Sequence, residues 1–331
     1  MDSHEQATRG AGAVIVALAI AVITITAGWA SGTAFGDHFA APACAAPCRE
    51  EGESRSALHG GDATPVAEVA GTSFSPEPTP TEPPDFPYVS ARSIAVVEGG
   101  CGALLFGRDQ DRRMPPASLT KLMTAAVAIE QGDLDMLITN HVDAAALHEE
   151  TGSTVMGLQP GMELSLLDLL YGLMLPSGND AAITIAEGVA GSEEEFVALM
   201  NAKVEALGLR NSHFTNPHGL DEDGLYSSAY DMAILARYVM QNETLSTITA
   251  AISWQPHWDG PPIWNGNRFL TDYEGADGVK IGYTEESAQT IVASATRGGR
   301  RIIASLMYSQ DRYTDAARTL DWAFAQASAC P

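Results

Sequence analysis

The chain has 331 residues, of which 42 are Asp or Glu and 18 are Lys or Arg, so its formal net charge is −24. Because 45% of the residues are hydrophobic, the chain can bury a full core in at least one large domain. This excludes a disordered protein, a collagen-like repeat and a small disulfide scaffold. The acidity and the lack of a basic stripe also exclude a nucleic-acid-binding protein, which needs clustered Lys and Arg.

The first 88 residues divide into two parts. Residues 11–35 carry no charged side chain and are numerous enough to span a bilayer, so we expect a signal peptide or a transmembrane signal anchor at 1–36. Residues 37–88 include the sequence SPEPTPTEPPDFP and are predicted to form a disordered linker. The folded domain is then expected at 89–331, outside the cytoplasm, anchored to the membrane or secreted after cleavage.

The pattern of apolar residues predicts both strands and helices in this domain. Runs at 93–97 and 103–106, joined by a Gly-rich turn, are typical of paired strands. Helical periodicity predicts helices at 119–130, 166–175, 181–190, 193–207 and 229–240. Strands are expected at 278–284, 290–296 and 301–308, and a last helix at 315–327. Strands at both ends of the domain indicate an α+β fold with an antiparallel sheet built from both termini.

A Ser-x-x-Lys sequence, Ser118 to Lys121, lies at the start of the predicted helix 119–130. The i, i+3 spacing places the lysine one turn from the serine on the same face. A serine becomes a good nucleophile when a neighbouring base takes its proton, and a lysine can be that base if burial lowers its pKa. The simpler interpretation is that Ser118 caps the helix.

Two further short sequences suit a catalytic cleft. Ser177 and Asn179 lie on a loop between two apolar helices, where Pro176 and Gly178 interrupt the helical pattern. Lys280 lies on a predicted strand, two residues before Gly282, which leaves room for a ligand to approach the backbone. The simpler interpretations are that the loop with Ser177 caps the next helix and that Lys280 is exposed to solvent.

Other catalytic patterns are missing from the sequence. It contains no Gly-x-Ser-x-Gly, His-Glu-x-x-His, P-loop or zinc-type cysteine spacing. His213 and His218 share one loop and are interpreted as turn residues.

Taken in order, the three short sequences resemble the Ser-x-x-Lys, Ser-x-Asn and Lys-Thr-Gly motifs of penicillin-binding proteins and serine β-lactamases. With the flanking PPASLTKLMTA, LPSGNDAA, NPHGLDEDG and DGVKIGYTEES, the chain is identified as a member of the D-alanyl-D-alanine carboxypeptidase family over about residues 88–327. The resemblance implies a β-lactamase-like fold, in which helices flank the antiparallel sheet and an all-helical subdomain adjoins it.

The resemblance also implies a role for each motif residue. Ser118 would be the acylated nucleophile, Lys121 its base, and Ser177 a relay of the proton to the leaving D-alanine. The backbone N–H groups of Ser118 and Tyr283 would form the oxyanion hole. The substrate would be a peptidoglycan stem peptide ending in D-Ala-D-Ala, and β-lactams would acylate the same serine. The reaction would need no metal and no organic cofactor. The residues expected to bind substrate are Asn179, Lys280, Gly282, Tyr283, Thr284 and Arg312, the last of them just before the final helix.

The chain departs from the family pattern at Ile281, where the third motif has Thr or Ser. That hydroxyl binds the terminal carboxylate of the substrate, so its loss predicts weaker carboxylate recognition. Two alternatives remain: a serine β-lactamase, and a non-catalytic module that binds penicillin or wall peptide.

The family fold also suggests how the four cysteines are paired. It places the first hairpin beside the end of the last helix, so the resemblance implies a Cys101–Cys330 disulfide. Cys44 and Cys48 could pair within the linker. Many relatives continue into a β-rich domain and an amphipathic anchor, whereas this chain is expected to stop just past its catalytic helix and to use its N-terminal segment as the anchor.

Overall fold

The computed structural model describes residues 82–330, and the predicted signal segment, most of the predicted linker, Cys44 and Cys48 lie outside the described residues. The main sheet has five antiparallel strands in the order β2-β1-β9-β8-β7. The strands are β1 (Ser93–Glu98), β2 (Leu104–Arg108), β7 (Ala276–Thr284), β8 (Ala288–Arg297) and β9 (Arg300–Ser309). The predicted α+β class, with a sheet drawn from both ends of the domain, is confirmed.

The first and last strands of the domain are neighbours inside the sheet. Ser93 pairs with Met307 and Glu98 with Ile302, so β1 lies directly beside β9. At the other edge, Lys280 pairs with Val292 and Gly282 with Thr290, which fixes the register of β7 against β8. Strand β7 is therefore an edge strand, paired with another strand of the sheet on one side only.

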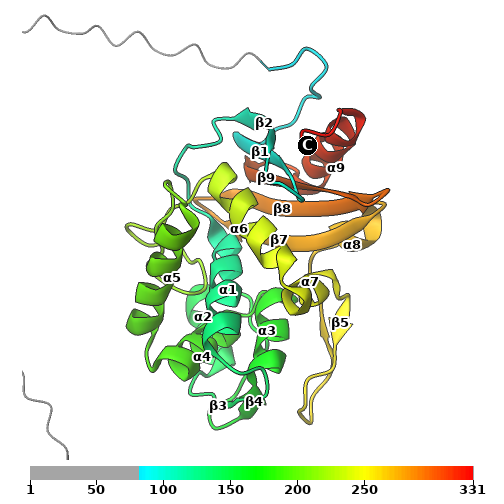
Figure 1. Cartoon of the computed structure of the whole chain (residues 1–331). Helices are drawn as coiled ribbons and strands as arrows, with labels where there is room; N and C mark the ends of the chain where they lie inside the picture. The colour runs from blue at the N-terminus through cyan, green and yellow to red at the C-terminus, as the bar shows by residue number, and fades with distance from the viewer. Residues whose placement is uncertain (1–81, 331) are drawn as a thin grey trace, which may run out of the picture. The chain divides into compact units, whose positions relative to one another are not determined.

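Both faces of the sheet are buried, in two separate cores. Side chains alternate across a strand, so Val292 packs in the core shared with the helices while Ile291 and Ala293 pack in the core under α9 (Arg312–Ala325). Figure 1 shows α9 (red) on one side of the sheet and the helical part of the fold on the other. The strands therefore read as apolar runs rather than as alternating patterns.

The helical part lies between β2 and β7 in the sequence. Its α-helices are α1 (Lys121–Gln131), α2 (Ala144–Thr151), α3 (Leu166–Met174), α4 (Asn179–Ala190), α5 (Glu193–Leu207), α6 (Ala229–Gln241), α7 (Glu243–Ala250) and α8 (Phe269–Asp272). A 3₁₀ turn, η1 (Ala117–Thr120), precedes α1. Two small ribbons complete it: β3 (Leu137–Thr139) with β4 (Glu163–Ser165), and β5 (Ser253–Trp254) with β6 (Ile263–Trp264).

Side-chain caps define where several of these helices begin. Ser192, Ser228 and Asn242 accept a hydrogen bond from a backbone N–H in the first turn of α5, α6 and α7. Such caps stabilise a helix by about 1 kcal/mol each. The last helix also begins earlier than predicted, at Arg312, because Asp311 accepts a hydrogen bond from the N–H of Thr314.

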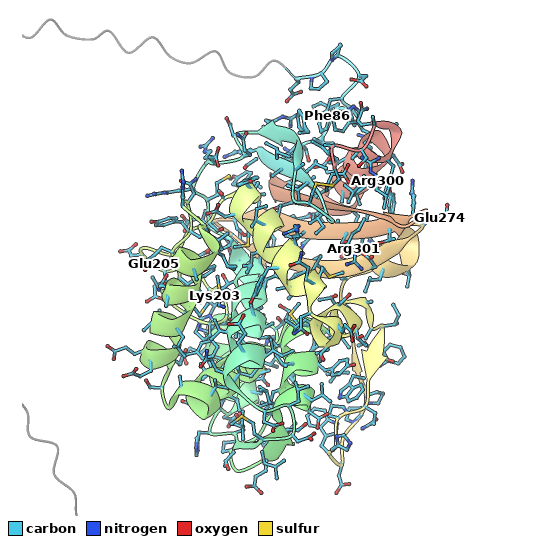
Figure 2. All side chains as sticks on the ribbon, in the orientation of Figure 1. Phe86, Lys203, Glu205, Glu274, Arg300 and Arg301 are labelled. Carbon is cyan, nitrogen blue, oxygen red and sulfur yellow. A yellow bond between two sulfur atoms is a disulfide. The ribbon has the colours of Figure 1, made fainter. Side chains whose placement is uncertain are left out.

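The two ends of the described chain are attached to the domain. Cys101, in the turn between β1 and β2, forms a disulfide with Cys330, 229 residues later, so the expected pairing is confirmed. Phe86, labelled in Figure 2, stacks on Phe106 with ring centroids 3.8 Å apart and meets the edge of Trp322. The folded part thus includes Phe86, three residues before the expected boundary at 89.

Within residues 82–330, the helices are all too short or too polar to cross a membrane. The apolar run at 11–35, on which the predicted signal segment depends, lies outside the described residues.

Candidate active site

Ser118 lies in η1, one turn before α1, rather than at the start of that helix as predicted. The 3₁₀ turn runs directly into α1, so Ser118 and Lys121 still share a face and their Oγ and Nζ atoms are 3.1 Å apart. The residue before the serine, Ala117, has φ 51°, in the left-handed region that disfavours a residue with a Cβ atom. Strain of this kind persists only where the surroundings fix the backbone, and it often marks functional sites.

Lys121 is fully buried and makes three polar contacts. Its Nζ lies 3.1 Å from Ser118 Oγ, 2.7 Å from Asn179 Oδ1 and 2.6 Å from the carbonyl oxygen of His218. A neutral amine has two N–H groups and one lone pair. The Oδ1 of Asn179 and the carbonyl oxygen of His218 can only accept, so they use the two N–H groups, and the lone pair is left for the serine hydroxyl.

The surroundings of Lys121 favour that neutral form. Burial lowers the pKa of its amine well below the usual range, and the positive charge of Lys280 lowers it further. The carboxylate of Asp180 acts in the opposite direction and raises the same pKa. Lys121 therefore has the properties of a general base for a serine hydroxyl.

Ser177 and Asn179 form the tight turn between α3 and α4. Ser177 has φ 63°, and its Oγ is buried without a hydrogen-bond partner among the described residues. Asn179 is the first residue of α4 and is 3% exposed, with its side chain held by Lys121. A buried hydroxyl without a partner is costly, so it is suited to bind a group that enters the site.

The loop 216–220 supplies the carbonyl that contacts Lys121. The side chain of Asn216 organises the loop, because its Oδ1 accepts from the N–H groups of His218 and Gly219 and its Nδ2 donates to the carbonyl of Leu220. Burial and the charge of Lys121 lower the pKa of His218 to about 3. Its imidazole is therefore neutral at physiological pH.

Strand β7 forms the opposite wall and packs tightly against η1. A Cβ atom on Gly282 would lie 2.9 Å from the backbone N of Ser118 and 2.6 Å from Oγ1 of Thr290. Only a glycine allows this approach, which brings the backbone of Gly282 next to the serine, while Tyr283 after it lines the cavity.

Lys280 does not line the cavity. Its side chain is 2% exposed and donates to the carbonyl of Ile281 at 3.0 Å. Burial and the nearby charge of Arg312 lower the pKa of Lys280 to about 7. Lys280 therefore affects the cavity through the electrostatic field of its buried ammonium group, and not by direct contact with a bound molecule.

Arg312 is the first residue of α9, rather than a residue before it as predicted. Its guanidinium donates to the carbonyl of Gly282 at 2.7 Å and to Oε1 of Gln289 at 3.1 Å. Thr284, also at this end of β7, donates through its Oγ1 to Asp221 at 2.9 Å. Both side chains line the cavity with Ile281, which partly packs into the core under α9.

These elements enclose a cavity of about 570 Å³. Of the predicted site residues, Ser118, Ser177, Asn179, Gly282, Tyr283, Thr284 and Arg312 line it, while Lys121 and Lys280 lie buried beneath it. Segments separated by more than 190 residues thus meet around Ser118, and the structure brings the three motifs together. Within residues 82–330, no group of three or more His, Cys, Asp and Glu side chains could hold a metal ion.

Two parts of the cavity wall were not predicted. His218, interpreted from the sequence as a turn residue, lines the cavity and supplies a contact to Lys121. Residues 151–154, at the end of α2 and just after it, form another wall, although the sequence there carries no motif. The loop NPHGLDEDG could have pointed to His218, whereas nothing in the sequence pointed to 151–154.

Comparisons with known proteins show the family of the chain. The chain matches the family model described as D-alanyl-D-alanine carboxypeptidase over residues 78–311. It is 37% identical to D-alanyl-D-alanine carboxypeptidase DacF of Bacillus subtilis over 71% of this chain and 62% of that protein. It is 39% identical to D-alanyl-D-alanine carboxypeptidase DacB2 of Mycobacterium tuberculosis over 73% of this chain and 84% of that protein.

Solved structures show the same fold. The Streptomyces K15 DD-transpeptidase superposes with a TM-score of 0.69 at 29% identity, over 72% of this chain and 99% of that chain. A D-alanyl-D-alanine carboxypeptidase from Mycobacterium tuberculosis H37Rv superposes with a TM-score of 0.68 at 36% identity, over 74% of this chain and 94% of that one.

The sheet, the helical part and the cavity between them define the β-lactamase-like fold of the penicillin-binding proteins. Within that class, the chain belongs to the D-alanyl-D-alanine carboxypeptidase family, as the sequence predicted. The chain spans about 62% of the length of the first curated relatives it matches.

Proposed function

We propose that this protein is a serine-type D-alanyl-D-alanine carboxypeptidase that removes the terminal D-alanine from peptidoglycan stem peptides. One observation carries the proposal: a buried lysine amine with a lowered pKa lies 3.1 Å from the Oγ of a serine that lines a cavity. The family membership supports the substrate class.

The reaction takes place in two steps. As Ser118 Oγ forms a bond to the carbonyl carbon of the penultimate D-alanine, its proton passes to Lys121 Nζ. The bond from that carbon to the nitrogen of the terminal D-alanine then breaks, and the proton reaches the leaving nitrogen through the Ser177 hydroxyl. Water next hydrolyses the acyl-serine, releases the shortened peptide and regenerates Ser118. A β-lactam would enter the same first step.

The negative charge that develops on the carbonyl oxygen would be bound by the backbone N–H groups of Ser118 and Tyr283. The close packing of Gly282 against η1 supports this assignment, because it places the residue before Tyr283 next to the backbone N of Ser118. Loss of one such donor lowers kcat by about 10²- to 10³-fold in other enzymes.

The substrate carboxylate would be bound near Arg312 and Thr284, with the charge of Lys280 beneath them. Ile281 offers no hydroxyl there, which removes one hydrogen bond to a charged group, worth about 1.5–3 kcal/mol or roughly 10- to 100-fold in affinity. We therefore expect Ile281→Thr to raise kcat/KM for a D-Ala-D-Ala peptide by about 10-fold. Ile281→Val, which keeps a branched apolar side chain, is the matched control. Equal activity of all three proteins would show that Arg312 and Lys280 compensate fully.

The proposed organisation follows the sequence expectations. Residues 1–36 would be a signal peptide or signal anchor, residues 37–88 a linker, and residues 89–331 the catalytic domain, acting outside the cytoplasm on the cell wall. Immunoblotting of culture medium and membranes, with N-terminal sequencing of the mature chain, would separate cleavage from anchoring.

The direct test is acylation by a labelled penicillin followed by intact mass measurement. We expect one adduct on the wild-type protein and none on Ser118→Ala. Release of D-alanine from diacetyl-Lys-D-Ala-D-Ala, dependent on Ser118, would complete the assignment. Rapid catalytic turnover of nitrocefin without peptide hydrolysis would indicate a β-lactamase instead, and the absence of any adduct would leave a non-catalytic binding module.

A further inference from the structure

Asp180, next to Asn179, carries a fully buried carboxylate whose contacts are almost all backbone N–H groups of another segment. Its Oδ1 accepts from Met156 N at 2.7 Å, and its Oδ2 accepts from Gly157 N at 2.8 Å and Leu158 N at 2.9 Å. Within residues 82–330, no Lys, Arg or His side chain forms an ion pair with it. A buried charge is tolerated when donors of this kind replace its water shell.

These bonds fix the segment 154–158 against the start of α4. Thr154, at its beginning, holds the catalytic turn from the other side: its Oγ1 donates to the carbonyl of Ser177 at 2.7 Å, and its own carbonyl accepts from Asn179 N at 2.9 Å. The turn from Ser177 to Asn179 is therefore enclosed between Thr154 and Asp180. A Cβ atom on Gly178 would lie 2.7 Å from Asp180 Oδ1, so the packing leaves no spare room.

The same carboxylate also acts on the lysine. The charged and titratable groups that face Lys121 are Asp180 from α4, Lys280 from β7 and His218 from the loop 216–220, and His218 is neutral. Lys280 and burial lower the pKa of Lys121, whereas Asp180 raises it.

We propose that Asp180 is a positioning residue of the acyl-transfer site. It holds the Ser177–Asn179 turn in place through the segment 154–158. It also places a negative charge near Lys121 that counteracts the positive charge of Lys280. This inference rests on the proposed function, because it assigns Asp180 a role in the reaction of Ser118.

The test is the rate of acylation by a labelled penicillin as a function of pH. Asp180→Asn keeps the shape but removes the charge and places an NH₂ group against backbone donors. We expect about a 10- to 100-fold slower acylation near neutral pH, since small displacements of catalytic groups have effects of this size. We also expect the acid limb of the profile to move to lower pH, because loss of a nearby negative charge lowers the pKa of the base.

Two further variants separate charge from position. Lys280→Met removes the opposing charge, so its acid limb should move to higher pH, opposite to that of Asp180→Asn. Thr154→Val removes one bond to the catalytic turn without changing charge, so acylation should slow severalfold while the limb stays in place. Asp315→Asn is the matched control, because Asp315 is also a buried carboxylate that accepts backbone N–H groups, from Ser90 and Ala91.

The outcomes are distinguishable. If wild-type protein is not acylated, the proposed function fails. If wild-type protein is acylated and Asp180→Asn has the same rate and pH profile, the function stands and the role of Asp180 is wrong. If Asp180→Asn is acylated more slowly but the acid limb of its pH profile has not moved, the electrostatic effect of Asp180 on Lys121 is refuted. If Asp180→Asn does not fold, an unchanged rate in Thr154→Val overturns the positioning role.

Discussion

Lys280 shows how a single buried charge links stability to activity. Its pKa falls from 10.5 when unfolded to about 7 when folded, first because of burial and then because of Arg312. Below about pH 7 the lysine is charged in both states and its burial opposes folding. Between that pH and 10.5 the unfolded state holds more protons than the folded one, so stability increases with pH.

Replacing Lys280 by Met should therefore stabilise the domain, and more so at acid pH. We expect the Tm to rise by several degrees near pH 6 and by much less near pH 10, while activity falls. Lys203→Met is the control, because burial lowers the pKa of Lys203 but its bond to Glu130 outweighs this and raises it. Thermal unfolding at both pH values checks the prediction, and an equal change in Tm at both would contradict it.

The hydrogen atom that serves as the side chain of Gly282 is needed for the approach of β7 to the serine. Gly282→Ala would place Cβ 2.9 Å from Ser118 N, so strand and turn must separate, and we expect acylation to slow by about 100-fold. Gly100→Ala is the control, because its Cβ would meet no atom closer than 3.8 Å. Stopped-flow acylation of both proteins, after circular dichroism shows that they are folded, measures the effect.

Loops as well as helices are built into the proposed catalytic centre. The loop 216–220 approaches η1 so closely that a Cβ atom on Gly219 would lie 2.0 Å from the carbonyl oxygen of Ala117. The carbonyl of His218, one residue earlier, accepts from Lys121. Displacing this loop would therefore remove a hydrogen-bond acceptor from Lys121, the proposed general base.

Gly219→Ala separates this contact from backbone strain when it is compared with Gly224→Ala. Both glycines have a left-handed φ, of 91° and 89°, but the nearest atom to a Cβ on Gly224 is 3.5 Å away. Both variants should lose stability, by about 1 kcal/mol from strain alone. Only Gly219→Ala should also lose at least about 10-fold in acylation. Denaturant unfolding and acylation rates measure the two effects, and parallel losses of activity would show that the close contact is unimportant.

The domain is also closed covalently, since the Cys101–Cys330 disulfide joins positions 229 residues apart. A cross-link that closes so long a loop restricts the unfolded chain strongly and should stabilise the fold by about 3–5 kcal/mol. We expect the double variant Cys101→Ser, Cys330→Ser to unfold about 10 °C lower. Acylation at 25 °C should be unchanged, because neither cysteine lines the cavity. Calorimetry of the oxidised and double-variant proteins checks the first expectation, and a loss of acylation would contradict the second.

The sequence predicted most of this domain where apolar spacing or a motif carried information. The strands β1, β2, β7, β8 and β9 were found as short apolar runs, and the longer helices were found because their buried residues recur at helical spacing. Helix α2 was missed because Ala144 is its one buried residue, so it shows no apolar face. The motifs placed Ser118, Ser177 and Lys280 together, but they could not reveal the wall at 151–154 or the buried position of Lys280, which depend on contacts between distant segments.

The pairing of β1 with β9 has a consequence for the order in which the protein becomes competent. During synthesis β1 leaves the ribosome about 200 residues before the strand that will lie beside it, and β7, which completes the wall opposite Ser118, is also among the last segments made. The proposed nucleophile and its base are thus translated early, and we expect them to stay inactive until the C-terminal strands dock. Covalent capture of a penicillin then reports complete folding of the nascent chain, and ribosome-arrested chains that lack β7–β9 should show none.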